Sequence, residues 1–188
     1  MNAAERLICS SSLWRHFTRR HVLPWALSGA HLGDHLLEVG AGYGVATALL
    51  KTRVARVTSL EYDHKSILKW KLQNNGGMRG AVCGDASRLP FADQTFSAVL
   101  AILVLHHLKS PQLQDQMFRE AFRVLRAGGV FIVLDIPDGW LHRVGHTGST
   151  FTPLEPNAAS RFLSAAGFSG ITMDSRKAAF RLMAVRPS

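Results

Sequence analysis

The chain has 188 residues, of which 47% are hydrophobic, enough for one domain with a buried central sheet. Its 22 basic and 13 acidic residues give a formal net charge of +9, which suits a phosphate backbone as well as a solvated basic surface. The longest apolar run, residues 98–105, is too short to span a bilayer, and we see no secretion signal. We therefore expect a cytoplasmic protein without stable membrane insertion, in which Cys9 and Cys83 are buried thiols.

Residues 1–30 interleave arginines with apolar side chains, a pattern that predicts one or two amphipathic helices with Pro24 as a break or a new start. Packing against the sheet edge and lying on a membrane surface are both open roles for this segment. Its basic cluster would suit a nucleic acid or simply face solvent. The cluster consists of Arg15, His16, Arg19, Arg20 and His21.

A glycine-rich turn follows the apolar strand at residues 36–39 and opens a helix. Gly40, Gly42 and Gly44 lack a Cβ and can take a positive φ, so the backbone can lie directly against a ligand. A tight strand-to-helix connection without a ligand is the alternative explanation. The dinucleotide fingerprint requires its third glycine where this chain has Val45, so a nicotinamide or flavin site fits imperfectly.

Acidic residues end the next two predicted strands. Residues 54–60 are typical of a buried strand that ends on Glu61, which is placed to accept both hydroxyls of a ribose. Residues 80–84 predict a strand that ends on Asp85, a possible acceptor for the exocyclic amino group of a purine. The chain order of glycine turn, ribose acid and adenine acid predicts an adenosyl ligand.

The rest of the chain continues the alternation of helix and strand, which predicts an α/β fold. Asp63 can cap a helix that runs through about Asn75 and stops at residues 76–77, and Ser110 with Pro111 can start another. We expect that second helix to end at Gly128 and Gly129. After it we predict a strand at 130–136, a loop at 137–153, a helix from about Pro156, and strands at 168–173 and 179–185.

Five motifs in this order resemble class I S-adenosylmethionine-dependent methyltransferases, especially the group that includes the ubiquinone and menaquinone C-methyltransferases. The resemblance implies a single Rossmann-like, doubly wound sheet of about seven strands, mostly parallel with an antiparallel last strand, and helices on both faces. It also implies a helical extension at 1–30 that covers cofactor or substrate, and a methyltransferase domain at 31–188. The motifs lie at 37–44, 60–63, 84–91, 96–108 and 120–129.

The same resemblance implies S-adenosylmethionine as cofactor, S-adenosylhomocysteine as product, and no metal. The backbone from Gly40 to Gly44 would pass under the methionine part, Glu61 would hold the ribose, and Tyr62 would lie near the adenine. The expected cofactor-binding residues are Glu38, Gly40, Ala41, Gly42, Gly44, Glu61, Tyr62, Asp85, Ala86 and Ala101.

No catalytic residue is assigned; His106 or His107 after the fourth strand could serve as base for an acceptor that must lose a proton, and His106 is the candidate we name. A His-His pair recurs in the resembling family across different substrates, so a structural role for His106 and His107 stays open. We expect Asp135, His142 and His146 to be solvated loop residues. His142 and His146 also lack the helix and the glutamate of an H-E-x-x-H metal site.

The sequence after the predicted fourth strand restricts the acceptor. Many family members that methylate amino groups carry Asn/Asp-Pro-Pro-Tyr/Phe there, whereas this chain has Ala-Ile-Leu-Val at residues 101–104. A small, apolar acceptor modified at carbon or oxygen is therefore favoured over a nucleobase nitrogen. An RNA-directed methyltransferase and a non-catalytic cofactor-binding module are the alternatives.

Overall fold

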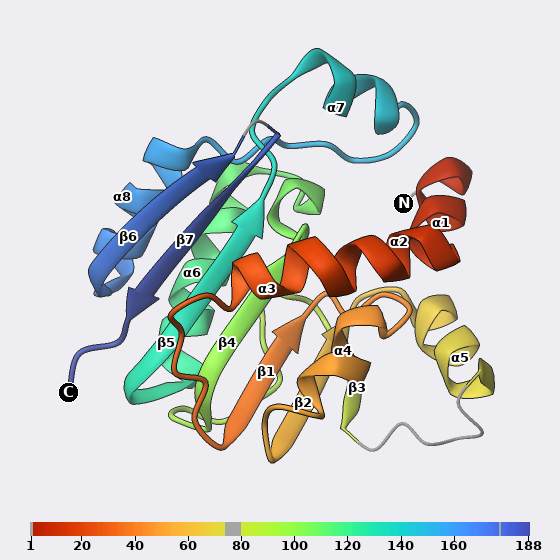
Figure 1. Ribbon diagram of the computed structural model, residues 1–188. Coiled ribbons are helices and arrows are strands. Elements are labelled where there is room, and N and C mark those ends of the chain that lie inside the picture. The colour runs from red at the N-terminus through yellow and green to blue at the C-terminus, as the bar shows by residue number, and fades with distance from the viewer. Residues whose placement is uncertain (1, 74–79, 177) are drawn as a thin grey trace.

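The computed structural model describes residues 2–73, 80–176 and 178–188 (Figure 1). Seven strands form one sheet in the order β3-β2-β1-β4-β5-β7-β6. The pairs from β3 through β5 are parallel, whereas β7 runs antiparallel to both β5 and β6. The predicted doubly wound, mostly parallel sheet is thereby confirmed. The strands are β1 (His35–Val39), β2 (Arg56–Glu61), β3 (Ala81–Cys83), β4 (Phe96–Ile102), β5 (Leu125–Asp135), β6 (Ser169–Arg176) and β7 (Ala179–Val185).

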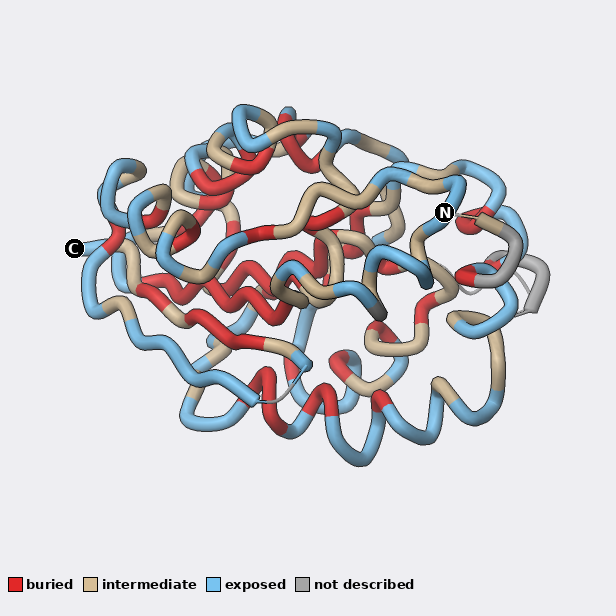
Figure 2. The backbone as a smooth tube through the Cα atoms, turned by 90° about the horizontal axis from the view of Figure 1, so that it is seen from above, coloured by how far each residue is buried: buried red, intermediate tan, exposed pale blue. Residues whose placement is uncertain are grey.

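Helices cover both faces of the sheet because successive strand residues point to opposite sides. Leu36, Leu100 and Ile132 pack into the core beneath α3 and α4, and the residues next to them pack into the core beneath α6 and α8. In Figure 2 the buried strand segments lie between helical layers that are exposed on their outer sides. The helices are α1 (Ala3–Ser10), α2 (Ser12–Phe17), the π-helical turn η1 (Thr18–Val22), α3 (Leu23–Ala26), α4 (Val45–Leu50), α5 (His64–Gln73), the 3₁₀ turn η2 (Leu105–His107), α6 (Pro111–Val124), α7 (Trp140–Gly145) and α8 (Pro156–Ala166).

Two predicted boundaries are wrong. Helix α6 starts as expected, with the Ser110 hydroxyl accepting from the Leu113 N–H at 3.3 Å, but it ends at Val124. The next residue, Leu125, already pairs with Phe96, so β5 includes the glycines that we expected to terminate the helix. The predicted loop at 137–153 contains the short helix α7. The predicted end of α5 at 75–77 lies outside the described residues.

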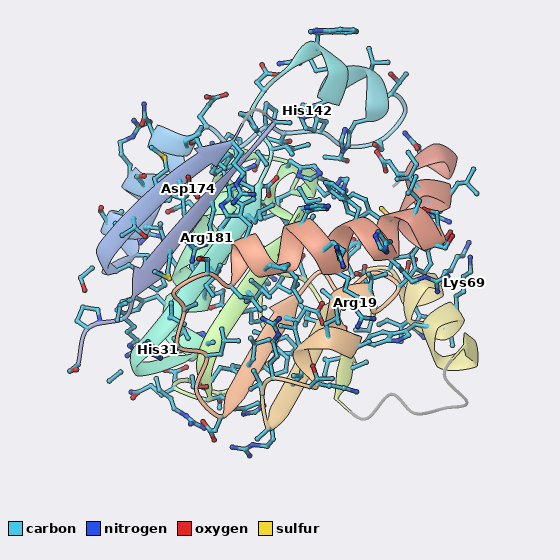
Figure 3. The ribbon with its side chains drawn as sticks, viewed as in Figure 1. Arg19, His31, Lys69, His142, Asp174 and Arg181 are labelled. Atoms are coloured by element: carbon cyan, nitrogen blue, oxygen red, sulfur yellow. The ribbon has the colours of Figure 1, made fainter. Side chains whose placement is uncertain are left out.

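After a break at Ser11, whose backbone is extended, α2, η1 and α3 form a continuous run over residues 12–26 across the sheet near the arrowhead of β1 (Figure 1). Pro24 does not break this run, because it lies just after the π-helical turn η1, where the Leu23 N–H bonds to the Thr18 carbonyl and the helical hydrogen-bond pattern is already widened. Arg181 on β7 donates to the carbonyls of Ala26 and Ser28 at 2.9 and 2.6 Å, and the Trp25 indole donates to Asp174 at 2.6 Å (Figure 3). The end of the extension is thus packed on the sheet.

Two further expectations concern the surface of the protein. Within the described residues, no helix is both long and apolar enough to cross a membrane. Cys83 is exposed and Cys9 half-buried, so the prediction of two buried thiols is wrong.

Candidate functional site

The glycine turn lies after β1, next to the point where the strand order reverses between β1 and β4, which is where ligands bind in open α/β sheets. Gly40, Gly42 and Gly44 all have a positive φ, of 74°, 53° and 73°. A Cβ on Gly40 would lie 2.3 Å from Cγ2 of Val104, and one on Gly44 would lie 2.0 Å from the Trp70 ring. A Cβ on Gly42 would meet no described atom within 4 Å. Packing explains two glycines, and the third leaves the backbone open to a ligand.

Both predicted acids lie at the same edge as the turn. One carboxylate oxygen of Glu61 accepts from the Gly42 N–H at 2.7 Å, and the other accepts from the Asp63 N–H at 2.8 Å. Glu61 therefore lies directly against the turn, at the end of β2. Asp85 is exposed beyond β3 and accepts from the N–H and hydroxyl of Ser87, both at 2.8 Å. Tyr62 is also exposed.

Glu38 lies beneath the turn and is buried. Its carboxylate accepts from the hydroxyls of Thr47 and Ser59, the latter at 2.9 Å, and so ties β1 to α4 and β2. Burial raises the pKa of Glu38 despite these two hydrogen bonds. Ala101 is buried in β4. The structure thus gathers the predicted residues at one edge, with Glu38 and Ala101 below the surface that Gly42 and Glu61 present.

A buried pair of side chains ends the neighbouring strands β4 and β5. Nδ1 of His106 lies 2.5 Å from one carboxylate oxygen of Asp135, and both residues are buried. The same carboxylate accepts from the backbone N–H groups of Leu105 and Ile136, at 2.8 and 2.7 Å. The prediction that Asp135 is solvated is wrong, because η2 covers the end of β5.

Two more histidines surround His106. The ring centroids of His107 and His146 lie 4.1 and 5.0 Å from that of His106, and His146 stacks on Phe151 at 4.6 Å. Only 13% of the His146 side chain is exposed, so its predicted solvated position is wrong. Burial, together with the nearby His106, lowers the pKa of His107 to about 4. These rings are therefore largely shielded from water.

His142 is the third of the predicted loop residues and lies on α7 (Figure 3). Its Nδ1 lies 2.9 Å from the Pro137 carbonyl, and the residue is half-buried. The solvated position expected for His142 is therefore only partly correct.

Helix α1 contacts both the region of the glycine turn and the histidines. Its Glu5 carboxylate accepts from the Ser149 hydroxyl and lies 3.8 Å from Nε2 of His146. Burial opposes ionisation of Glu5, but hydrogen bonds from Ser149 and the Asn2 N–H lower its pKa overall. Arg6 lies 3.9 Å from Asp63, two residues after Glu61. Sequence analysis missed Glu5, although the capping box formed by Asn2 and Glu5 marks the start of α1.

Val104 places the histidines next to the glycine turn. Its side chain fills the space that a Cβ on Gly40 would need, and it precedes His106 by two residues. The glycine turn and the histidine cluster, defined as His106, His107 and His146, therefore share one edge of the sheet.

The glycine turn lies where the strand order reverses, and carboxylates follow at the ends of the next two strands. This arrangement is typical of a Rossmann-like α/β protein with a nucleotide-type site. Residues 37–133, more than half of the chain, match the family described as Methyltransferase domain, and the chain belongs to this family.

Proteins with similar sequences are also named as methyltransferases. The chain is 32% identical over 174 residues to a probable S-adenosylmethionine-dependent methyltransferase of Mycolicibacterium smegmatis, covering 87% of this chain and 63% of the relative. It is 26% identical over 149 residues to the ubiquinone/menaquinone biosynthesis C-methyltransferase UbiE of Laribacter hongkongensis, covering 77% and 53%. The chain thus spans between about half and two thirds of these relatives' lengths.

The fold also matches solved structures. A methyltransferase solved in complex with the Haloferax volcanii Trm112 methyltransferase activator superposes with a TM-score of 0.77, at 15% identity, over 97% of each chain. At this identity the likeness establishes the fold.

Proposed function

We propose that the chain binds S-adenosylmethionine and transfers its methyl group to a small, apolar acceptor at carbon or oxygen, with S-adenosylhomocysteine as product. The observation that carries this proposal is the shared edge of the glycine turn and the histidine cluster, joined through Val104. Family membership supports the reaction class.

The residues at the turn fit this cofactor. Gly42 leaves its backbone open at a positive φ, and Glu61 offers a carboxylate within one hydrogen bond of it. Glu61 would hold the ribose hydroxyls, Asp85 with Ala86 would meet the adenine edge, and Tyr62 would lie beside the base. Gly40, Ala41 and Gly44 would shape the backbone under the methionine part, and Glu38 and Ala101 would support it from below. When bound, the cofactor supplies an electrophilic methyl group on a sulfonium.

Most of the acceleration would come from positioning, because displacement at a sulfonium methyl needs an aligned nucleophile in a dry site. His106 is the residue that we place beside the acceptor. Asp135 holds Nδ1 of this ring, so Nε2 is the nitrogen that can act on the acceptor. The half-buried apolar residues 102–104 suit an apolar molecule.

Carbon is the favoured target, because the relatives of the chain include UbiE, whose name specifies C-methylation. Helix α1 and the segment 137–153 would form the outer wall of the acceptor pocket. Their contacts through Glu5, and through the Asn2 amide to the carbonyls of Gly145 and Thr147 at 3.2 and 3.0 Å, support this role. The cytoplasmic location stays a prediction.

A second candidate is an RNA acceptor, favoured by the basic cluster at residues 15–21, whose arginines are exposed in the structure. Incubation with S-adenosylmethionine carrying a tritiated methyl, against a metabolite extract and against purified RNA, separates the two. We expect label in the small-molecule fraction. Label in RNA alone would contradict the proposal, and label in neither, with tight cofactor binding, would indicate a non-catalytic binding module.

A further inference from the structure

In all three rings of the histidine cluster, Nδ1 faces a hydrogen-bonding oxygen atom. Nδ1 of His107 lies 3.2 Å from the Thr150 carbonyl, and Nδ1 of His146 lies 2.6 Å from the His142 carbonyl. A carbonyl oxygen only accepts, so both Nδ1 atoms must carry the proton. Nδ1 of His106 meets the Asp135 carboxylate in the same way. In each neutral ring the lone pair is therefore on Nε2.

Lone pairs on three neighbouring imidazoles form a set of donors that a transition-metal ion can bind. One ring nitrogen from each of the three residues lies within 4.8 Å of those of the other two. A tetrahedral zinc ion at about 2.0–2.1 Å from each nitrogen needs the nitrogens about 3.4 Å apart, so modest closure of the rings would complete such a site. The Glu5 carboxylate, 3.8 Å from Nε2 of His146, adds a negative charge on one side.

The partners of the rings are those that metal-binding histidines use. Such residues donate their second nitrogen to a carboxylate or a backbone carbonyl, which fixes the tautomer and the ring plane. Here Asp135 fills that position for His106, and two carbonyls fill it for His107 and His146. The ligands come from η2 and from the turn after α7, so they do not have the H-E-x-x-H spacing of a site on one helix.

We propose that His106, His107 and His146 bind a divalent transition-metal ion, with Glu5 as an additional oxygen ligand. Imidazole ligands suit zinc, iron, nickel and copper, and zinc is the simplest probe. The expectation of a metal-free site, made from sequence, would then be wrong for this chain.

We expect the bound ion to act on the methyl acceptor, and this role of the ion rests on the proposed function. A divalent cation beside the glycine turn would favour an acceptor with a phenolic or enolisable oxygen, because coordination lowers the pKa of such a group. With the ion bound, Nε2 of His106 would act on the acceptor through the ion, so the acceptor proton would leave to solvent. The electron pair of the resulting anion would form the new bond to the methyl carbon. The carbon–sulfur bond would break with its electrons on sulfur, leaving a neutral thioether.

Titration of the full, chelator-treated chain tests the inference. We expect one Zn²⁺ per chain by calorimetry, and Co²⁺ should give the visible absorption bands of a four-coordinate site. His107→Gln and His146→Gln should each weaken Zn²⁺ binding at least about a hundredfold, and Asp135→Asn about ten- to a hundredfold. His142→Gln is the matched control, because its unchanged backbone carbonyl still accepts from His146, and its Zn²⁺ affinity should stay within about twofold.

Absence of a one-to-one site in the unmodified chain would overturn the inference, as would equal losses in His142→Gln and His146→Gln. S-adenosylhomocysteine affinity, measured on the same variants, shows that each is folded. Loss of Zn²⁺ binding with retained S-adenosylhomocysteine affinity in the ligand variants is the expected pattern. A chain that binds Zn²⁺ but not S-adenosylhomocysteine would instead contradict the proposed function and leave the metal site standing.

Discussion

The two halves of the proposed site, one for the cofactor and one for the acceptor, are built in different ways. The centre of the cofactor half, the glycine turn with Glu61, comes from one continuous stretch, β1 to β2, in which the Gly42 N–H meets Glu61 at 2.7 Å across a turn with positive φ values. The acceptor half combines Glu5, His106, Asp135 and His146, which come from four separate segments. The first half depends on local backbone geometry, whereas the second exists only once the sheet and α1 are in place.

The largest effect is expected where the cofactor half is most tightly packed. Gly44→Ala would combine a strained φ of 73° with a Cβ placed 2.0 Å from the Trp70 ring. Strain of about 1–2 kcal/mol and overpacking of about 1–3 kcal/mol should lower the free energy of unfolding by roughly 3 kcal/mol. Denaturant titration measures this loss.

Gly29→Ala is the matched control, because its φ is 70° and a Cβ there would meet no described atom within 4 Å. It should lose only the strain, about 1–2 kcal/mol. Equal losses in the two variants would show that packing of the turn against Trp70 contributes nothing.

Asp135→Asn should damage the acceptor half alone. The amide cannot accept from His106 and from the N–H groups of both Leu105 and Ile136 in the way the carboxylate does. We expect methyl transfer to fall about a hundredfold, with S-adenosylhomocysteine affinity changed by less than about twofold. Radiolabel transfer and calorimetry on one preparation measure both. A parallel loss of affinity would mean that the two halves are not separable.

Glu61→Ala and Asp85→Ala should have the opposite effect. A hydrogen bond to a charged group contributes about 1.5–3 kcal/mol, so each change should weaken S-adenosylhomocysteine binding roughly ten- to a hundredfold. Calorimetry measures this, with Asp138→Ala, an exposed acid paired with Arg143, as control. Unchanged affinity in both variants would remove these residues from the cofactor site.

A further effect concerns the stability of the metal-free protein as the pH changes. The pKa of His107 falls from 6.5 to about 4 on folding, in contact with His106 and His146 and facing Glu5. Between these values the unfolded chain binds a proton that the folded chain refuses, so the free energy of unfolding should decrease as pH falls from about 6.5 to about 4 and then level off. His107→Gln should reduce this slope, whereas the exposed His16→Gln should not. Identical slopes would contradict the buried position of His107.

Sequence predicted the cofactor half because its signals are local. Glycine spacing, strand periodicity and the acids at strand ends are readable within short windows, and the sheet order follows from parallel connections. The acceptor half was largely missed. Asp135 looked solvated because nothing near it in sequence shows that η2 covers β5, and His146 becomes a neighbour of His106 only through the turn after α7. The end of α6 was misplaced because pairing of Leu125 with Phe96 overrides the glycine signal.

A crystal structure of the chain with S-adenosylhomocysteine and an added divalent ion tests the central claim most directly. The account predicts the homocysteine over Gly40 to Gly44, the ribose hydroxyls on Glu61, the adenine beside Asp85, and the sulfur facing the space next to His106. A ligand bound elsewhere, or a sulfur turned away from the histidine cluster, would contradict a site in which one edge of the sheet holds both cofactor and acceptor.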